Sequence, residues 1–136
     1  MFRIIIDPNV IAGVLIGGIT RDRFVTLTQR LEILEFIYCD QLIQEIGTFS
    51  QKAYFQKKGI NDLTVRSFIA FYQEFALKVM VTSQVKVGRD RNDHYLLSLS
   101  RDARADFPVT GDPDLLSLRK YSNTQIVTIK ALIELL

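Results

Sequence analysis

Two apolar runs in this chain each end in an aspartate. The first run is Phe2-Arg3-Ile4-Ile5-Ile6, followed by Asp7, and the second is Phe107-Pro108-Val109-Thr110-Gly111, followed by Asp112. A short and nearly continuous apolar run is typical of a strand that is buried on both faces, as strands are in parallel sheets. Ligands of such sheets bind beyond the carboxyl ends of the strands. The two runs therefore predict a buried parallel sheet with acidic side chains along one edge.

The rest of the chain alternates between strand and helix patterns. Further strands are expected near residues 35–38, 79–82 and 125–128. Helices are expected from Pro8 to Gly17, at 20–31, from Asp40 to Gly59, at 62–76, at 93–103, after Pro113 and at 131–136. Strands that alternate with helices form right-handed crossovers, which place helices on both faces of a parallel sheet. We therefore expect one α/β domain spanning residues 1–136.

The composition narrows the class of protein and its compartment. The single cysteine, Cys39, cannot form an internal disulfide, and no signal peptide is recognisable, so a reducing cytoplasm is the expected location. No apolar run reaches the roughly 18 residues that a membrane span needs, and no Cys/His cluster is available for zinc. The net charge of +2 would be +7 without the five acids described next. A surface that is basic outside these five acids would suit a polyanionic partner, or its Lys and Arg side chains would simply be solvated.

Five acids occupy positions that this fold would bring together: Asp7, Glu45, Asp93, Asp112 and Asp114. Glu45 and Asp93 each lie on the apolar side of an expected helix, near an N-terminus that opens on the acidic edge. Buried carboxylates repel each other and lose hydration, and a divalent cation removes both costs. Oxygen ligands suit Mg²⁺ or Mn²⁺. Helix capping alone would explain Asp7, Asp112 and Asp114, but it does not explain Glu45 or Asp93.

Three segments resemble the PIN domain, a nuclease family common among the toxins of toxin–antitoxin pairs. They are residues 4–10 (Ile-Ile-Ile-Asp-Pro-Asn-Val), 93–97 (Asp-His-Tyr-Leu-Leu) and 105–116 (Ala-Asp-Phe-Pro-Val-Thr-Gly-Asp-Pro-Asp-Leu-Leu), and Gln44-Glu45-Ile46 fits the family's helix glutamate. The resemblance covers nearly the whole chain in the right order. It implies a three-layer α/β/α fold with a five-stranded parallel sheet in the order 3-2-1-4-5. It also implies metal-dependent cleavage of RNA and an antitoxin protein as a partner.

The resemblance implies roles for individual residues. The catalytic set would be Asp7, Glu45, Asp93 and Asp112, and the residues binding Mg²⁺ or Mn²⁺ would be Asp7, Asp93, Asp112 and Asp114. Glu45 would bind a metal or orient the attacking water. The family usually has Thr or Ser where this chain has Pro8, so Asn9 or Thr110 is expected to supply the missing polar contact. Arg89 and Arg91 would either contact substrate phosphates or simply be solvated.

Three functions compete at this point. The leading one is an endoribonuclease, the toxin of a toxin–antitoxin pair, and the second is a catalytically weak PIN-like module that binds RNA or protein. A phosphotransfer domain of the receiver or haloacid-dehalogenase type also uses acids at strand ends, but Asp7 has no partner acid two residues later. A homodimer is expected because the segment 131–136 is too apolar to be freely exposed, unless that segment packs on the sheet.

Overall fold

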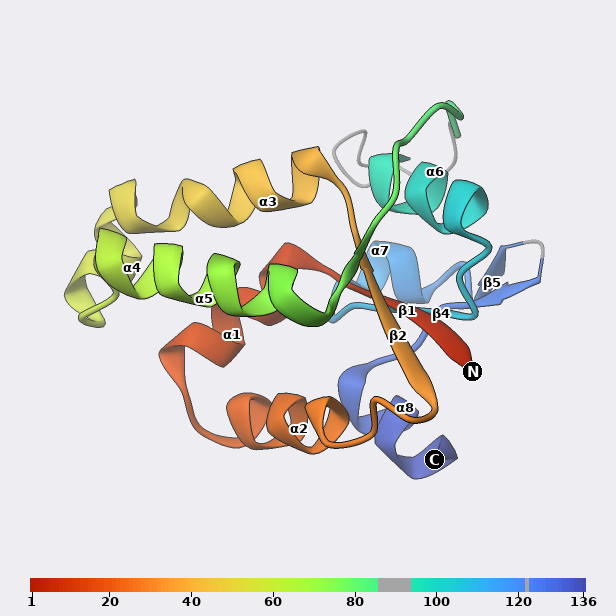
Figure 1. Ribbon diagram of the computed structural model, residues 1–136, viewed down its shortest axis with the longest axis horizontal. Helices are drawn as coiled ribbons and strands as arrows, with labels where there is room; N and C mark the ends of the chain where they lie inside the picture. The colour runs from red at the N-terminus through yellow and green to blue at the C-terminus, as the bar shows by residue number, and fades with distance from the viewer. Residues whose placement is uncertain (86–93, 122) are drawn as a thin grey trace.

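The computed structural model describes residues 1–85, 94–121 and 123–136 (Figure 1). The strands are β1 (Phe2–Ile6), β2 (Leu34–Tyr38), β3 (Leu77–Lys78), β4 (Phe107–Val109), β5 (Lys120–Tyr121) and β6 (Thr124–Gln125). The helices are α1 (Pro8–Ile16), α2 (Ile19–Thr28), α3 (Asp40–Gly47), α4 (Ala53–Lys57), α5 (Asp62–Phe75), α6 (His94–Ala103), α7 (Pro113–Leu116) and α8 (Ile129–Leu135), with a 3-10 turn at Phe49–Gln51. None of the described helices is both long and apolar enough to cross a membrane.

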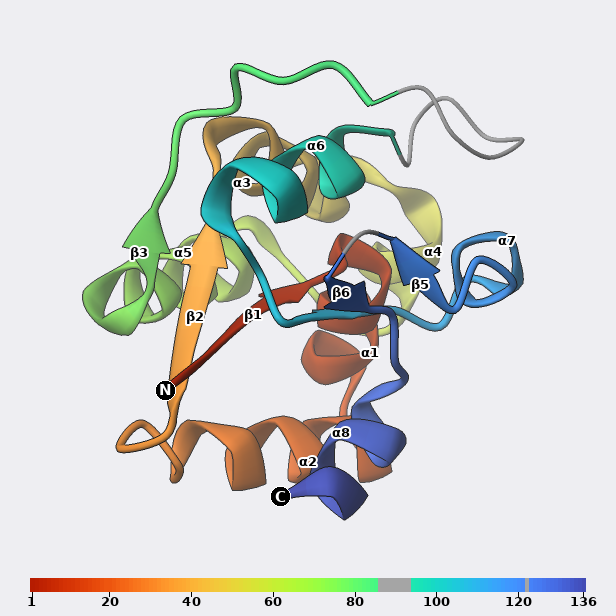
Figure 2. The same cartoon turned by 90° about the vertical axis from the view of Figure 1, so that its right-hand side faces the viewer.

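The first four strands form the central sheet. Among the described residues its order is β3-β2-β1-β4, and every pairing is parallel. β1 lies in the middle, where Ile4 is in register with Phe36 of β2 and with Phe107 of β4. Figures 1 and 2 show α6 on one side of the sheet and α2 and α8 on the other. The predicted α/β architecture with a parallel sheet flanked by helices is thus confirmed, and Asp7 follows the central strand at its carboxyl end.

The third strand is shorter than predicted and begins earlier in the chain. It covers only Leu77–Lys78, and residues 79–82, where the sequence predicts the strand, are not paired as a strand. The backbone N–H groups of Thr82 and Ser83 instead donate to the Asp102 carboxylate, at 2.7 and 2.9 Å. Because Asp102 belongs to α6, these bonds hold the chain against that helix and away from the sheet edge.

The predicted fifth parallel strand at 125–128 is not formed among the described residues. β6 pairs antiparallel with β5 instead, and only Val127 makes a parallel bridge, to Val109 of β4. Val127 N–H donates to the Pro108 carbonyl at 3.1 Å, and Thr110 N–H donates to the Val127 carbonyl at 2.9 Å. Regular pairing would also use the N–H of residue 108, two residues before Thr110 and directed to the same side. Proline has no N–H, so the ladder reduces to a single bridge.

The single helix expected from Asp40 to Gly59 is interrupted in its middle. α3 ends at Gly47, and the Thr48 hydroxyl donates to the Glu45 carbonyl at 2.7 Å, which replaces a helical bond. Lys52 then has extended backbone angles, with φ −91° and ψ 129°, before α4 begins. Glu45 therefore lies in the last turn of α3 and not near a helix N-terminus, as its sequence position suggested.

The C-terminal segment packs within the chain. α8 lies against α2 and β4, and Leu132 is fully buried there. Leu135 on the same helix remains more than half exposed. Most of the apolar surface that suggested a homodimer is thus covered by the chain itself, which is the alternative that the sequence left open.

Candidate active site

Asp7 is the most constrained acid at the carboxyl edge of the sheet. It caps α1, where its Oδ1 accepts a hydrogen bond from the Asn9 backbone N–H at 2.8 Å. Its Oδ2 accepts a hydrogen bond from the Thr110 hydroxyl at 2.7 Å. Pro8 occupies the first helical position, where its missing N–H and fixed φ are tolerated. The Asp7 carboxylate is therefore held by donors from two distant segments, and the residue is only 4% exposed.

Thr110 connects two of the predicted site acids. Its hydroxyl donates to Asp7 and accepts a hydrogen bond from the Asp112 backbone N–H at 3.0 Å, and the residue is 2% exposed. The predicted polar contact of Thr110 thus exists, but it is made to the acids themselves. Asp112 in turn caps α7, because its Oδ1 accepts from the Asp114 N–H at 2.9 Å. The capping explanation is correct for Asp7 and Asp112, yet a cap needs no burial, so it does not account for the buried Asp7 carboxylate.

A cleft of about 260 Å³ brings together acids from three segments of the chain. It is lined by Asp7, Pro8, Asn9, Glu45, Thr48, Phe49, Lys52, Tyr95, Leu96 and Asp112. Asp7 follows β1, Glu45 comes from α3 and Asp112 precedes α7. Three of the five predicted acids therefore line one cleft, although Glu45 reaches it from the end of α3 and not from a helix N-terminus.

The electrostatics of the cleft disfavour its own negative charges. Burial raises the pKa of Asp7, the hydrogen bonds from Thr110 and Asn9 offset part of this rise, and the nearby Asp112 adds to it. Burial also raises the pKa of Glu45, and repulsion from Asp7 raises it further, whereas Tyr95 and Lys52 lower it. Acids with raised pKa values at a cleft are typical of functional sites, although structural networks produce them as well.

Two residues of the cleft, Tyr95 and Lys52, were not predicted as site residues, although Tyr95 lies within the segment 93–97 that carries the resemblance. The Tyr95 hydroxyl is buried and has no hydrogen-bond partner of normal geometry in the described part of the chain, and burial beside Glu45 raises its pKa. Lys52 is the basic residue of the lining, and its Nζ lies 5.4 Å from the centroid of the Phe49 ring. In the sequence, Lys52 follows Glu45 by seven residues, a spacing that places two residues on the same face of a helix, and this was the only signal for Lys52. Tyr95 has the sequence pattern of an ordinary core aromatic residue.

The remaining predicted site residues are Asn9 and Asp114, which the structure describes, and three residues that lie outside the described ranges. Asp114 is exposed in the first turn of α7 and does not line the cleft. Asp93, Arg89 and Arg91 lie outside the described residues. Asn9 lines the cleft, and its backbone rather than its side chain makes the hydrogen bond to Asp7.

The cleft offers the type of ligand atom that Mg²⁺ or Mn²⁺ prefers, but its described acids do not surround an ion. Asp7, Glu45 and Asp112 offer the oxygen donors that hard cations prefer. Within residues 1–85, 94–121 and 123–136, however, no three acidic, His or Cys side chains are close enough to form a complete metal-binding group. Mg²⁺ commonly keeps several waters and uses only one or two carboxylates together with substrate phosphates. The described acids match that open type of site.

Comparison with known proteins does not identify a family for this chain, so its class is described from the fold and the cleft. No protein-family model, no curated protein and no solved structure matches this chain. The class defined by the structure is an α/β domain with a parallel sheet and an acidic cleft at the carboxyl ends of its strands.

Proposed function

We propose that this chain is an endoribonuclease that hydrolyses RNA phosphodiester bonds with the help of Mg²⁺ or Mn²⁺. The observation that carries the proposal is the meeting of Asp7, Glu45 and Asp112 in one cleft with Lys52. Acids with raised pKa values favour a bound cation, and a nearby lysine favours an anionic substrate. The proposed fold type is the PIN-like three-layer arrangement, with residues 125–127 beside β4 in the place of its fifth strand.

Each residue of the cleft has a proposed part in the reaction. Asp7 and Asp112 would hold the cation, which when bound polarises water and the phosphate oxygens. Glu45 would accept the proton of the attacking water, and its raised pKa, which brings it closer to the working pH of a general base, supports this role. Lys52 would contact a non-bridging phosphate oxygen. A new P–O bond forms from water, one ester P–O bond breaks, and the leaving oxygen takes up a proton from solvent.

A second hollow next to the cleft would hold the nucleotide beside the cleaved bond. It measures about 500 Å³, shares Asn9 and Asp112 with the cleft, and is also lined by Thr110, whose hydroxyl donates to Asp7. Its remaining lining is Val10, Gly13, Thr20, Gly111, Pro113, Thr128 and Ile129. A mostly apolar wall with a few polar groups is typical of a small-molecule subsite. The Asn9 side chain, which lines both hollows, is the proposed contact to the substrate.

A cleavage assay on single-stranded RNA with Mn²⁺ tests the proposal. We expect Asp7→Asn and Glu45→Gln each to lower the rate at least about 100-fold, a loss of about 2.7 kcal/mol of transition-state stabilisation. Asp22→Asn is the matched control, because Asp22 is an exposed acid in the first turn of α2 and does not line the cleft. Circular dichroism would verify that each variant is folded. Unchanged cleavage by the Asp7 and Glu45 variants, or cleavage in the presence of a chelator, would contradict the proposal.

The second candidate is a catalytically weak PIN-like module that binds RNA or protein. Two observations favour it: Pro8 stands where a hydroxyl residue is usual, and the described acids do not complete a metal cage. The same assay separates the two, because this candidate binds RNA with no metal-dependent product. An antitoxin partner belongs to the first proposal, and an adjacent gene for a small DNA-binding protein would support it.

A further inference from the structure

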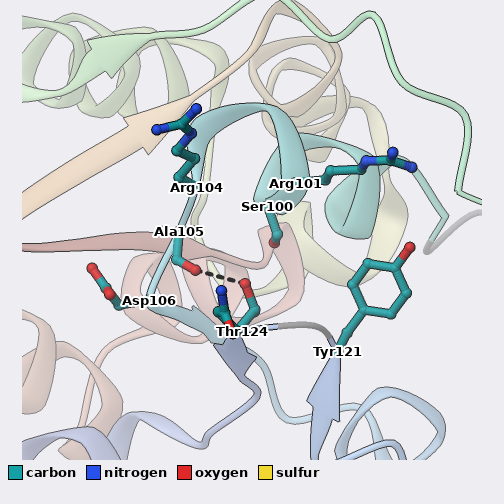
Figure 3. Close-up of a pocket in the computed structure, with 8 residues that line it drawn as sticks. Ser100, Arg101, Arg104, Ala105, Asp106, Tyr121 and Thr124 are labelled. Atoms are coloured by element: carbon teal, nitrogen blue, oxygen red, sulfur yellow. Dashed lines mark hydrogen bonds between the residues drawn. The ribbon is translucent and has the colours of Figure 1, made fainter.

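A larger hollow lies at the opposite edge of the sheet from the acidic cleft. It measures about 580 Å³ and is lined by Ser100, Arg101, Arg104, Ala105, Asp106, Tyr121, Asn123 and Thr124 (Figure 3). Asp106 directly precedes β4, and its Oδ2 accepts a hydrogen bond from the Arg3 N–H at the start of β1, at 2.8 Å. Asp7 and Thr110 mark the other end of the same two strands. Asp106 and Thr110 are four residues apart along the extended chain of β4, so roughly 13 Å separates the two hollows.

Hydrogen bonds fix the walls of this pocket. The Thr124 hydroxyl donates to the Ala105 carbonyl at 2.6 Å, and Gln125 N–H donates to the Asp106 carbonyl at 3.0 Å. These bonds attach the β5–β6 hairpin to the chain before β4. The Ser100 hydroxyl, on the pocket side of α6, donates to the Leu96 carbonyl at 2.7 Å. These hydrogen bonds therefore hold the backbone around the pocket in place.

The two arginines of the pocket have no close ion-pair partner among the described residues, although Arg101 interacts electrostatically with the neighbouring Asp102. Neither Arg101 nor Arg104 makes a side-chain hydrogen bond or an ion pair within 4 Å in the described part of the chain. Both residues are exposed, and Asp106 is the acid of the lining. In Figure 3, Arg101 and Tyr121 lie toward one end of the pocket, and Arg104 and Asp106 lie toward the other. One end thus offers a guanidinium and a phenol hydroxyl, and the other a guanidinium and a carboxylate.

The backbone conformation of Arg104 makes it a suitable position for a test by substitution. Its φ is 51°, in the left-handed region that favours glycine. Ala105 N–H donates to the Ser100 carbonyl at 2.9 Å, which closes α6 in the manner of a helix end where glycine is usual. Glycine fits this turn without strain, so Arg104→Gly can remove the guanidinium without disturbing the backbone. Arg119, with φ 56°, has the same backbone conformation but does not line the pocket.

We propose that this pocket binds a nucleotide through its phosphate, either as a free nucleotide or as the end of an RNA strand. Arg101 and the Tyr121 hydroxyl bind the phosphate, because guanidinium groups form strong charge-assisted hydrogen bonds to phosphate. Arg104 and Asp106 provide a donor and an acceptor for the sugar or base. The volume lies within the range of roughly 300–1,000 Å³ that is typical of small-ligand sites. The proposal does not depend on the endonuclease function, because the acidic cleft lies at the other edge.

Isothermal titration calorimetry with adenosine 5′-monophosphate tests the site, in a buffer with a chelator so that no divalent cation bridges phosphate to the acidic cleft. We expect the nucleotide to bind, and adenosine without phosphate to bind at least about tenfold more weakly. Arg101→Gln should weaken nucleotide binding about tenfold, and Arg119→Gln, the matched control outside the pocket, should leave it unchanged. Arg104→Gly should also weaken binding without lowering the thermal midpoint, because it relieves the left-handed backbone.

Hexaadenylate with and without a 5′ phosphate distinguishes the source of the ligand. Stronger binding of the phosphorylated strand than of the free nucleotide identifies a strand end, and the reverse order identifies a free nucleotide. No binding of either ligand up to about 1 mM overturns the proposal. Binding that survives Arg101→Gln, or that Arg119→Gln weakens equally, also overturns it. Neither result bears on cleavage, which is measured with metal and at the other edge.

Discussion

The hydrogen bond from Thr110 to Asp7 gives the sharpest test of how this site is held together. Replacing Thr110 with valine keeps the shape of the side chain and removes only its hydroxyl. Two interactions are lost: the bond to Asp7 Oδ2 at 2.7 Å and the acceptor of the Asp112 N–H at 3.0 Å. Both belong to a residue that is 2% exposed, so water does not readily replace the hydroxyl.

The size of the effect follows from the charge on Asp7. A hydrogen bond to an ionised group contributes about 1.5–3 kcal/mol, and valine leaves no cavity that would add to the loss. Asp112 is only partly buried, so water can satisfy its N–H. We therefore expect Thr110→Val to lower the free energy of unfolding by about 2 kcal/mol at pH 7.

The pH dependence identifies the partner of the lost bond. The Thr110 bond favours the ionised form of Asp7, so its loss raises the pKa of Asp7 further above its ordinary value. The difference in the free energy of unfolding between wild type and Thr110→Val is therefore largest at pH values above the pKa of Asp7. It should shrink to about half as the pH falls through that pKa, because a bond to a neutral carboxyl is about half as strong.

Urea unfolding of both proteins between about pH 4 and pH 8, without metal, measures this difference. Thr110→Ser is the control, because it keeps the hydroxyl and loses one buried methyl group, at a cost of about 1 kcal/mol that does not change with pH. If Thr110→Val is as stable as wild type at pH 7, or if its loss is equal at every pH, Thr110 does not hold an ionised Asp7.

Three further predictions concern the acids, the core and the assembly. Because burial raises the pKa values of Asp7 and Glu45, the folded state binds more protons than the unfolded state, and metal-free stability should fall as the pH rises through those pKa values. Thermal unfolding should show that Mn²⁺ raises the midpoint more at about pH 8 than at about pH 5, and an equal rise would contradict this. Tyr72 is fully buried and its hydroxyl has no hydrogen-bond partner among the described residues, so Tyr72→Phe should leave the urea midpoint unchanged or raise stability by up to about 1 kcal/mol. The exposed Leu135 is the part of the α8 surface that remains for the homodimer predicted from the sequence, so light scattering should show a dimer for wild type and a monomer for Leu135→Gln; a wild-type monomer at high concentration would refute the dimer.

The sequence predicted the two central strands, several of the helices and the edge of the sheet at which Asp7 and Asp112 lie. Apolar runs identify β1 and β4 because a strand buried on both faces must be apolar throughout, and a 3.6-residue period identifies α5 and α6. The parallel topology then places Asp7 and Asp112 on one edge, because all carboxyl ends point the same way. The short third strand, and the lack of a regular fifth parallel strand among the described residues, were not predicted, because strand pairing depends on partners such as the Asp102 carboxylate and on the N–H that Pro108 lacks.

The tertiary structure alone decided which side chains meet. Asp7 and Thr110 are 103 residues apart, and their hydrogen bond depends on the register of β1 against β4. The broken helix placed Lys52 in the cleft, and the packing of α6 placed Tyr95 beside Glu45. Local backbone geometry limits each segment to a helix or a strand, so the sequence can encode that choice within a few residues. Contacts between distant segments form only when the whole core packs, so no short stretch of sequence specifies them.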